Sequence, residues 1–214
     1  QRELREAGFD PEQLPCVATG YGRISVPFAD KTVTEITCHG RGAALLHGGE
    51  ELTVIDIGGQ DTKIIRVEGG MVKDFVMNDK CSAGTGRFLE VMANTLALRP
   101  DALCDLARRG GGTSISSMCT VFAESEVISK LSQGLPIPDI VAGIHTSVVE
   151  RTYGLMRRAG IQPLIAMTGG VALNEGLRTR LAERAGHQIV TSPLAQFNGA
   201  LGAALYAREK FARA

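Results

Sequence analysis

Three short turns in the sequence place glycine beside polar side chains, and each follows an apolar strand pattern. They contain Gly58 and Gly59 within the stretch 56–63 (DIGGQDTK), then Gly84, Thr85 and Gly86, then Gly169 and Gly170. Glycine lets backbone amides approach an anion, and a helix that starts after the turn adds partial positive charge. Any one of them alone can be only a tight turn. Together they predict a cradle for a phosphorylated ligand.

The first turn also carries side chains suited to phosphoryl transfer. Asp56 and Asp61 flank it as carboxylates that hold Mg²⁺-bound water would, and Lys63 could neutralise a phosphate. We expect Asp56 and Gln60 to order a hydrolytic water and the Mg²⁺ ion, although Asp56 could instead only cap the turn. The chain has neither a GxxxxGK[ST] segment nor a GxGxxG segment that opens a βαβ unit. The pattern therefore favours nucleotide binding by another architecture.

Five cysteines are widely spaced along the chain, and an odd number without an export signal favours thiols or metal ligands over disulfides. Cys81 and Cys119 each lie at or just before a predicted helix N-terminus, where the helix dipole stabilises a thiolate. Each could also be a small buried hydrophobic residue. We interpret Cys16, Cys38 and Cys104 as core residues.

Composition excludes several other classes of function. Lys plus Arg and Asp plus Glu both count 23, so no basic excess indicates nucleic acid as a partner. The four histidines lack HExxH spacing, which argues against zinc catalysis, and no serine has a GxSxG context. No apolar run is long enough to span a membrane and no signal-peptide pattern is present, which favours a cytoplasmic protein.

Strands and helices alternate along the chain, which predicts an α/β fold. The stretches 51–59 and 61–78 predict a β-meander, and 14–20 predicts a short strand. Helices are expected over 34–46, 86–98, 138–160 and from a cap at Ser116 and Ser117 to about 132. The segments 164–186 and 188–210 each predict a strand followed by a helix. In the last of these helices, Gly202 and Ala203 should allow close packing against a neighbour.

Several of these stretches resemble the actin, sugar kinase and heat-shock chaperone superfamily. VIDIGGQDTK is similar to its second phosphate loop, MTGGVALNEGLR to its adenosine motif, and TEITCHGRGAALL and NGALGAALYA to its two connecting helices. The resemblance implies an actin-like (ribonuclease H-like) ATPase fold, with 1–50 as the remainder of the first subdomain, 51–190 as the second and 191–214 as the returning helix. The superfamily's first phosphate loop has no counterpart after Gln1. We therefore expect a fragment that lacks the N-terminal part of the first domain, which puts its own ATP turnover in question.

Within that superfamily, five motifs resemble the ATPase family of 2-hydroxyacyl-CoA dehydratase activators and benzoyl-CoA reductase ATP-binding subunits. They are ATGYGR, VIDIGGQDTK, NDKCSAGTGRF, CTVFAESEVISKLS and SPLAQFNGALGAALYA. The resemblance implies ATP or ADP with Mg²⁺ and one 4Fe-4S cluster per dimer, held by Cys81 and Cys119 of each subunit. By analogy with the superfamily, Glu124 or Glu126 would hold the ribose. Asn174 would belong to the adenosine loop or cap the helix after it.

The resemblance further implies ATP-dependent transfer of one electron to a partner acyl-CoA dehydratase or reductase. The subunit would be a homodimer or paired with a similar subunit, and reduced ferredoxin or flavodoxin would be the electron donor. A shift of the Gly84 turn as ATP becomes ADP would move Cys81. The alternatives are a resident benzoyl-CoA reductase subunit, a sugar or acetate kinase relative without a cluster, and a non-catalytic nucleotide-sensing module.

Overall fold

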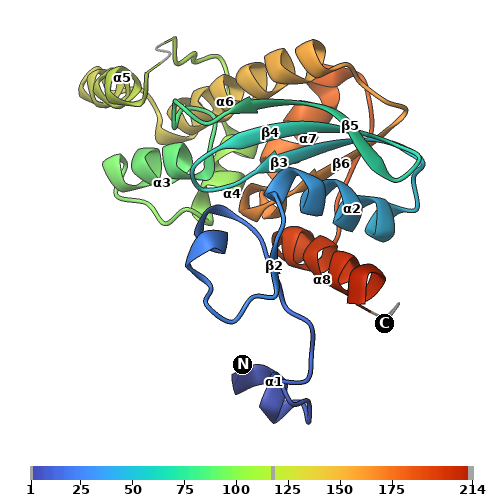
Figure 1. Cartoon of the computed structure of the whole chain (residues 1–214). Helices are drawn as coiled ribbons and strands as arrows, with labels where there is room; N and C mark the ends of the chain where they lie inside the picture. The colour runs from blue at the N-terminus through green and yellow to red at the C-terminus, as the bar shows by residue number, and fades with distance from the viewer. Residues whose placement is uncertain (1, 117–118, 212–214) are drawn as a thin grey trace.

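A five-stranded mixed sheet forms the centre of the molecule in the computed structural model, which describes residues 2–116 and 119–211 (Figure 1). The strand order is β5-β4-β3-β6-β7. The strands are β3 (Glu51–Ile57), β4 (Thr62–Glu68), β5 (Met71–Asn78), β6 (Leu164–Thr168) and β7 (Ile189–Val190). Strands β3, β4 and β5 are antiparallel neighbours, which confirms the predicted meander. Strand β6 pairs with β3 in parallel, so that Asp56 lies opposite both Lys63 and Thr168.

Strand β3 is buried on both faces because its apolar side chains alternate between two separate clusters. Leu52 and Val54 belong to the cluster that includes Ala43 of α2 (Glu35–His47), whereas Ile55 and Ile57 join the larger cluster on the other face. Successive side chains of a strand point to opposite faces, so an almost continuous apolar run needs cover on both sides. The β3 sequence ELTVIDI therefore specifies a central strand.

Helix α2 covers one face of the sheet, and α8 (Asn198–Phe211), which is also rich in small residues, packs against α2 (Figure 1). A Cβ built on Gly202 of α8 would lie 1.8 Å from the carbonyl oxygen of Cys38, and one on Gly42 would lie 2.2 Å from that of Asn198. The two backbones are in direct contact at these points. The predicted close packing of this helix is confirmed, and Cys38 is fully buried as expected.

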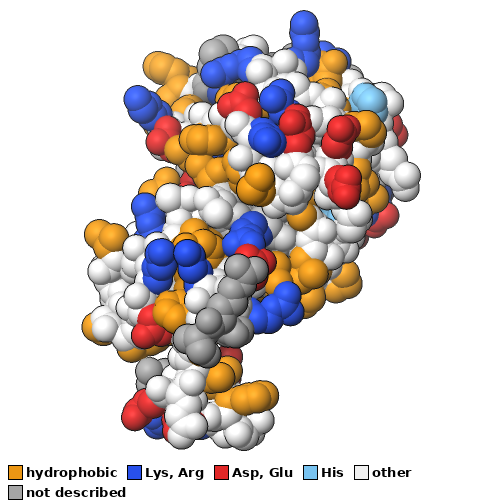
Figure 2. Space-filling view, turned by 45° about the vertical axis from the view of Figure 1, so that its right-hand side comes forward, with side chains coloured by type: hydrophobic (Ala, Val, Ile, Leu, Met, Phe, Trp, Pro, Cys, Tyr) orange, Lys and Arg blue, Asp and Glu red, His pale blue; other side chains and the backbone are white. Residues whose placement is uncertain are grey.

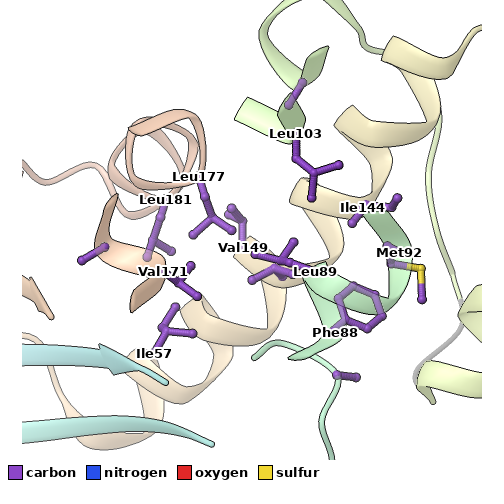
Figure 3. Packing of buried hydrophobic residues seen from close by; sticks show 14 of the residues in the cluster. Ile57, Phe88, Leu89, Met92, Leu103, Ile144, Val149, Val171, Leu177 and Leu181 are labelled. Atoms are coloured by element: carbon purple, nitrogen blue, oxygen red, sulfur yellow. The ribbon is translucent and has the colours of Figure 1, made fainter. Parts of the chain in front are cut away.

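Five helices pack on the opposite face and form the larger core. They are α3 (Gly86–Thr95), α4 (Ala102–Arg109), α5 (Thr120–Ser132), α6 (Ile137–Ala159) and α7 (Glu175–Ala185). Figure 3 shows Phe88 and Leu89 of α3 gathered with Ile144 and Val149 of α6, while Leu177 of α7 lies toward Val171. Helix α3 is shorter than predicted because Ala97 adopts a left-handed conformation (φ 54°) that separates it from α4. Helix α5 begins at Thr120; Ser117, one of its two predicted caps, lies outside the described residues.

The N-terminal segment lies apart from the sheet, at the bottom of Figure 1. It contains α1 (Arg2–Glu6), the two-residue strands β1 (Val17–Ala18) and β2 (Lys31–Thr32), paired in parallel, and the 3-10 helix η1 (Tyr21–Ser25). The strand predicted over 14–20 is thus reduced to two residues, and Cys16 is only half-buried, so its interpretation as a core residue is wrong. Figure 2 shows apolar side chains on the surface of this part. Among residues 2–116 and 119–211, no helix combines the length and apolarity needed to cross a membrane.

Candidate functional site

The three glycine turns converge at the carboxyl end of β3. The Gly86 N–H donates to the Gly58 carbonyl oxygen at 2.8 Å, and the next N–H along the chain donates to that of Gly59 at 3.1 Å. On the other side, a Cβ built on Gly169 would lie 2.4 Å from the Ile57 carbonyl oxygen, and Gly169 has φ 83°. Both the contact and the backbone conformation exclude a larger residue there. Turns that are far apart in sequence therefore form one continuous backbone surface.

A cavity of about 510 Å³ opens over this surface. Its volume falls within the range of small-molecule sites in proteins. Its walls combine apolar groups, on which a nucleotide base could lie, with the carboxylates of Glu90 and Asp101. The lining residues are Gly58, Gly59, Gly86, Leu89, Glu90, Pro100, Asp101, Cys104, Gly170, Val171, Leu173, Asn174 and Gln196. The arrangement can hold a ligand with an apolar ring and hydroxyl groups, with its anionic end over the glycines.

A second, more polar cavity of about 350 Å³ shares Gly58, Gly59 and Gly170 with the first. It is lined on its far side by Asp56, Gln60 and Asp61, together with Glu35 and His39 of α2. Sequence reasoning identified the first group but missed the two α2 residues. Their spacing of four residues, which places them on one helix face, was the available signal.

Lys63 is buried beneath this cavity and ion-paired with three carboxylates. Its Nζ lies 2.5 Å from Asp61 Oδ1, 3.5 Å from Asp56 Oδ2 and 3.6 Å from Glu35 Oε1. Burial alone would lower the pKa of Lys63, but the three carboxylates together raise it above its ordinary value. Lys63 therefore stays charged. Lys63 also lines this cavity, so its expected role in neutralising a phosphate stays a prediction.

The donor set around Lys63 fits a magnesium ion bound with a nucleotide. Three carboxylates face one ammonium group, and the buried Asp61 Oδ2 has no hydrogen-bond partner among the described residues. Within residues 2–116 and 119–211, no group of three or more His, Cys, Asp or Glu side chains could hold a metal ion alone. Mg²⁺ is commonly held by one or two carboxylates, with waters and phosphate oxygens completing the octahedron. Asp61 and Asp56 can fill that role.

Asp56 is fixed by partners from three elements. Besides Lys63 of β4, its Oδ1 accepts from the Thr168 hydroxyl of β6 at 2.9 Å and lies 3.2 Å from Nδ1 of His39 in α2. Asp56 is 2% exposed as a residue, and its side chain is 4% exposed. It is therefore a rigid group at the edge of the polar cavity, as a water-positioning residue must be.

Gly84 and Thr85 lie behind the cavities and do not line either of them, among the residues described. The Thr62 hydroxyl donates to the Gly84 carbonyl oxygen at 2.8 Å, and the Thr85 hydroxyl donates to the Ser82 carbonyl oxygen at 2.6 Å. Gly84 has φ 91°, so glycine is required at this position. These two residues fix the loop that carries Cys81.

Two residues of the sequence-based interpretation have different surroundings from those expected. Glu124 accepts from the Thr95 hydroxyl at 3.0 Å and is absent from the described cavity linings, so this geometry does not support its contact with a ribose. Glu90 and Asp101 are the acidic residues of the larger cavity instead. Cys104 was interpreted as a core residue, but it lines that cavity, and its Sγ accepts from the Gly176 N–H at 3.2 Å.

Cys81 and Cys119 are linked through the residues that follow them. The hydroxyl oxygens of Ser82 and Thr120 lie 2.9 Å apart, within hydrogen-bond distance. Cys119 is the exposed N-cap residue of α5, and Cys81 is half-buried in the loop before α3. One chain thus presents two neighbouring thiols at its surface, half of the four that a 4Fe-4S cluster usually requires. This donor set fits a cluster shared with a second subunit.

The mixed sheet, the connecting helices and the glycine-lined cavity define an actin-like ATPase fold, as predicted. The ethanolamine utilization protein EutJ from Carboxydothermus hydrogenoformans shares this fold with a TM-score of 0.55, over 90% of this chain and 66% of that one, at 14% identity. The family profile of the BadF/BadG/BcrA/BcrD ATPases matches residues 1–207. This chain belongs to the BadF/BadG/BcrA/BcrD ATPase family, which confirms the resemblance seen in the sequence.

Several relatives with high identity to this chain are described as activators of 2-hydroxyacyl-CoA dehydratases. The (R)-2-hydroxyglutaryl-CoA dehydratase activating ATPase of Acidaminococcus fermentans is 56% identical over 92% of this chain and 76% of its own length. The structure of the 2-hydroxyisocaproyl-CoA dehydratase activator from Clostridium difficile with bound ADPNP has a TM-score of 0.91, at 44% identity, covering 100% of this chain and 82% of that one. One of the benzoyl-CoA reductase subunits of Thauera aromatica is more distant, at 35% identity over 98% of this chain and 78% of its own length.

Proposed function

We propose that this protein is an activating ATPase of a 2-hydroxyacyl-CoA dehydratase. It binds ATP with Mg²⁺ in the two joined cavities and hydrolyses it. Asp56 and Gln60 orient the attacking water, Asp61 contributes to magnesium binding, and the glycine turns hold the phosphates. The greater identity to dehydratase activators than to the benzoyl-CoA reductase subunit supports the activator over the resident reductase subunit.

Cys81 and Cys119 of two copies would hold one 4Fe-4S cluster, which supplies one-electron transfer to the dehydratase, with reduced ferredoxin or flavodoxin as donor. The observation that carries this proposal is the contact between Ser82 and Thr120. Each hydroxyl belongs to the residue after one of the two cysteines, so the contact brings both thiols to one place.

A chain of hydrogen bonds supports coupling between the nucleotide and the cysteines. The turn at Gly58 accepts from Gly86, the Thr85 N–H and hydroxyl both donate to the Ser82 carbonyl oxygen, and the Ser82 hydroxyl contacts Thr120. Loss of the γ-phosphate shifts the turn at Gly58, and the shift reaches both cysteine-bearing segments. Hydrolysis would thereby change the geometry of the thiols that face the second subunit.

Iron and acid-labile sulfide, measured per dimer on protein purified without oxygen, test this function. We expect about four irons per dimer, lost in both Cys81→Ser and Cys119→Ser. Cys16→Ser is the matched control, because its thiol is also partly exposed but lies in the N-terminal segment. A colourless, iron-free protein that still binds ATP would contradict the electron-transfer function and favour a kinase relative or a nucleotide sensor.

A further inference from the structure

His145 is a fully buried histidine in the middle of α6, and both of its ring nitrogens have partners. Its Nδ1 lies 3.0 Å from the Val141 carbonyl oxygen, and its Nε2 lies 3.1 Å from Nδ2 of Asn174. A carbonyl oxygen only accepts, so Nδ1 carries the hydrogen. In the neutral ring Nε2 is then an acceptor, which matches the amide donor of Asn174.

Asn174 connects this histidine to the nucleotide cavity. It ends the 3-10 helix η2 (Gly170–Leu173), lines the larger cavity and is the N-cap of α7. While Nδ2 donates to His145, Oδ1 accepts from the Leu177 N–H at 3.0 Å. The two contacts allow only one orientation of the side-chain amide. His145 therefore holds Asn174, at the end of η2, from the side away from the cavity.

The surroundings of His145 favour the neutral ring. Burial lowers the pKa of His145 below its ordinary value, the hydrogen bond to the Val141 carbonyl oxygen opposes that shift, and the charge of Arg180 in α7 adds to it. From α4, the titratable group beside Asn174 is Cys104, whose Sγ accepts from Gly176 N–H; η2 has no titratable side chain. On protonation Nε2 would become a donor facing the donor Nδ2, so the contact with Asn174 would be lost.

We propose that His145 is a positioning residue of the nucleotide site, which in its neutral form holds Asn174 in the binding conformation and on protonation releases it, so that nucleotide affinity falls in acid. The proposal rests on the proposed function, because it assumes that the larger cavity is the nucleotide site. No residue of α6 is among the described residues that line the cavity. The proposal therefore adds a residue behind the lining to those that control nucleotide affinity.

The dissociation constant for Mg²⁺-ADP, measured by calorimetry between pH 5.5 and 8, tests the proposal. In the unsubstituted protein we expect the affinity to fall about fivefold more on acidification than it does in His145→Gln, the effect of losing one hydrogen bond. The glutamine can keep an acceptor near the position of Nε2 but does not titrate. His145→Asn keeps a donor near Nδ1 and loses the acceptor, so it should bind about fivefold more weakly already at pH 8.

Protonation of ADP itself changes all profiles equally, and the exposed His187 supplies the matched control: His187→Gln should retain the unsubstituted profile. Superimposable profiles for the unsubstituted protein and His145→Gln would overturn the proposal. If a His145 variant does not fold, the ¹⁵N spectrum of the imidazole decides, since the proposal requires a neutral ring with hydrogen on Nδ1 at pH 8. Absence of ADP binding at every pH would instead overturn the nucleotide site, and this proposal with it.

Discussion

At the scale of single residues, the site depends on opposite charges that balance one another while largely shielded from water. Lys63 is 2% exposed and lies among Asp56, Asp61 and Glu35. A buried ion pair is weak evidence for stability, but removal of one partner leaves charges that are both desolvated and unpaired. Lys63 is therefore a structural support of the carboxylates that we assign to water and magnesium.

Replacement of this lysine should be costly. We expect Lys63→Met to lower the free energy of unfolding by about 3 kcal/mol at pH 7, measured by urea denaturation. Lys73→Met is the control, because Lys73 is exposed on β5 and should change stability by less than about 0.5 kcal/mol. Since the folded-state pKa of Lys63 is raised, its stabilisation is complete below the ordinary value of 10.5 and is lost only as the pH rises through the higher folded value. Equal stability of the two variants would contradict this assignment.

Cys104 offers a chemical test of where the nucleotide lies. Its half-buried thiol lines the larger cavity, so bound nucleotide should cover it. We expect saturating Mg²⁺-ADP to slow alkylation of Cys104 by a maleimide at least tenfold, an occupancy effect at ligand concentrations well above Kd. Mass spectrometry of the labelled peptides measures this, with Cys16 as the internal control whose rate should not change. Unprotected Cys104 in ADP-saturated protein would show that the ligand binds elsewhere.

At the scale of elements, the packing of α2 against α8 requires close contact between their backbones. Adding one methyl group, by a glycine to alanine substitution, tests this requirement. A Cβ at Gly202 would lie 1.8 Å from a backbone oxygen, whereas Gly154 of α6 has nothing within 4 Å of the corresponding position. We expect Gly202→Ala to lower the free energy of unfolding by about 2 kcal/mol, through overpacking. Gly154→Ala should instead raise it by about 0.5–1 kcal/mol, because alanine favours a helix. Thermal unfolding of both variants checks the opposite signs.

Some elements of the fold were predictable from the sequence, and others were not. The meander and the glycine turns were predictable because their signals are local: apolar runs broken by glycine. The ion pair of Lys63 with Glu35 was not predictable, because Glu35 belongs to α2 and no local pattern indicates that this helix packs beside β4. The predicted helix over 86–98 ended three residues too late, because nothing in the apolar periodicity indicated the left-handed conformation of Ala97. Local patterns identified the loops, and tertiary packing decided their neighbours.

At the scale of the whole molecule, α5 presents an apolar surface next to Cys119. Val121 is 66% exposed, Phe122 68% and Ile128 50%. Apolar side chains gathered on one helix indicate an interface. Together with the two cysteines of each chain, this surface supports the proposed dimer.

A charge on that surface should separate the subunits. We expect Phe122→Glu to be monomeric in analytical ultracentrifugation and to lose its iron, because the carboxylate would be buried without a partner. Met71→Glu is the control, since Met71 is 64% exposed and belongs to β5 rather than to the α5 surface. A dimeric Phe122→Glu variant would place the interface on another surface.

The parallel pairing of β3 with β6 also has a consequence for how the molecule folds. The meander joins strands that are adjacent in sequence, whereas the contact of Asp56 with Thr168 spans 112 residues. Closing so long a loop is entropically expensive and slows chain assembly. The proposed nucleotide site lies where these two strands meet, so we expect it to be completed late in folding. Bound nucleotide should therefore lower the rate constant of unfolding and leave the rate constant of refolding almost unchanged.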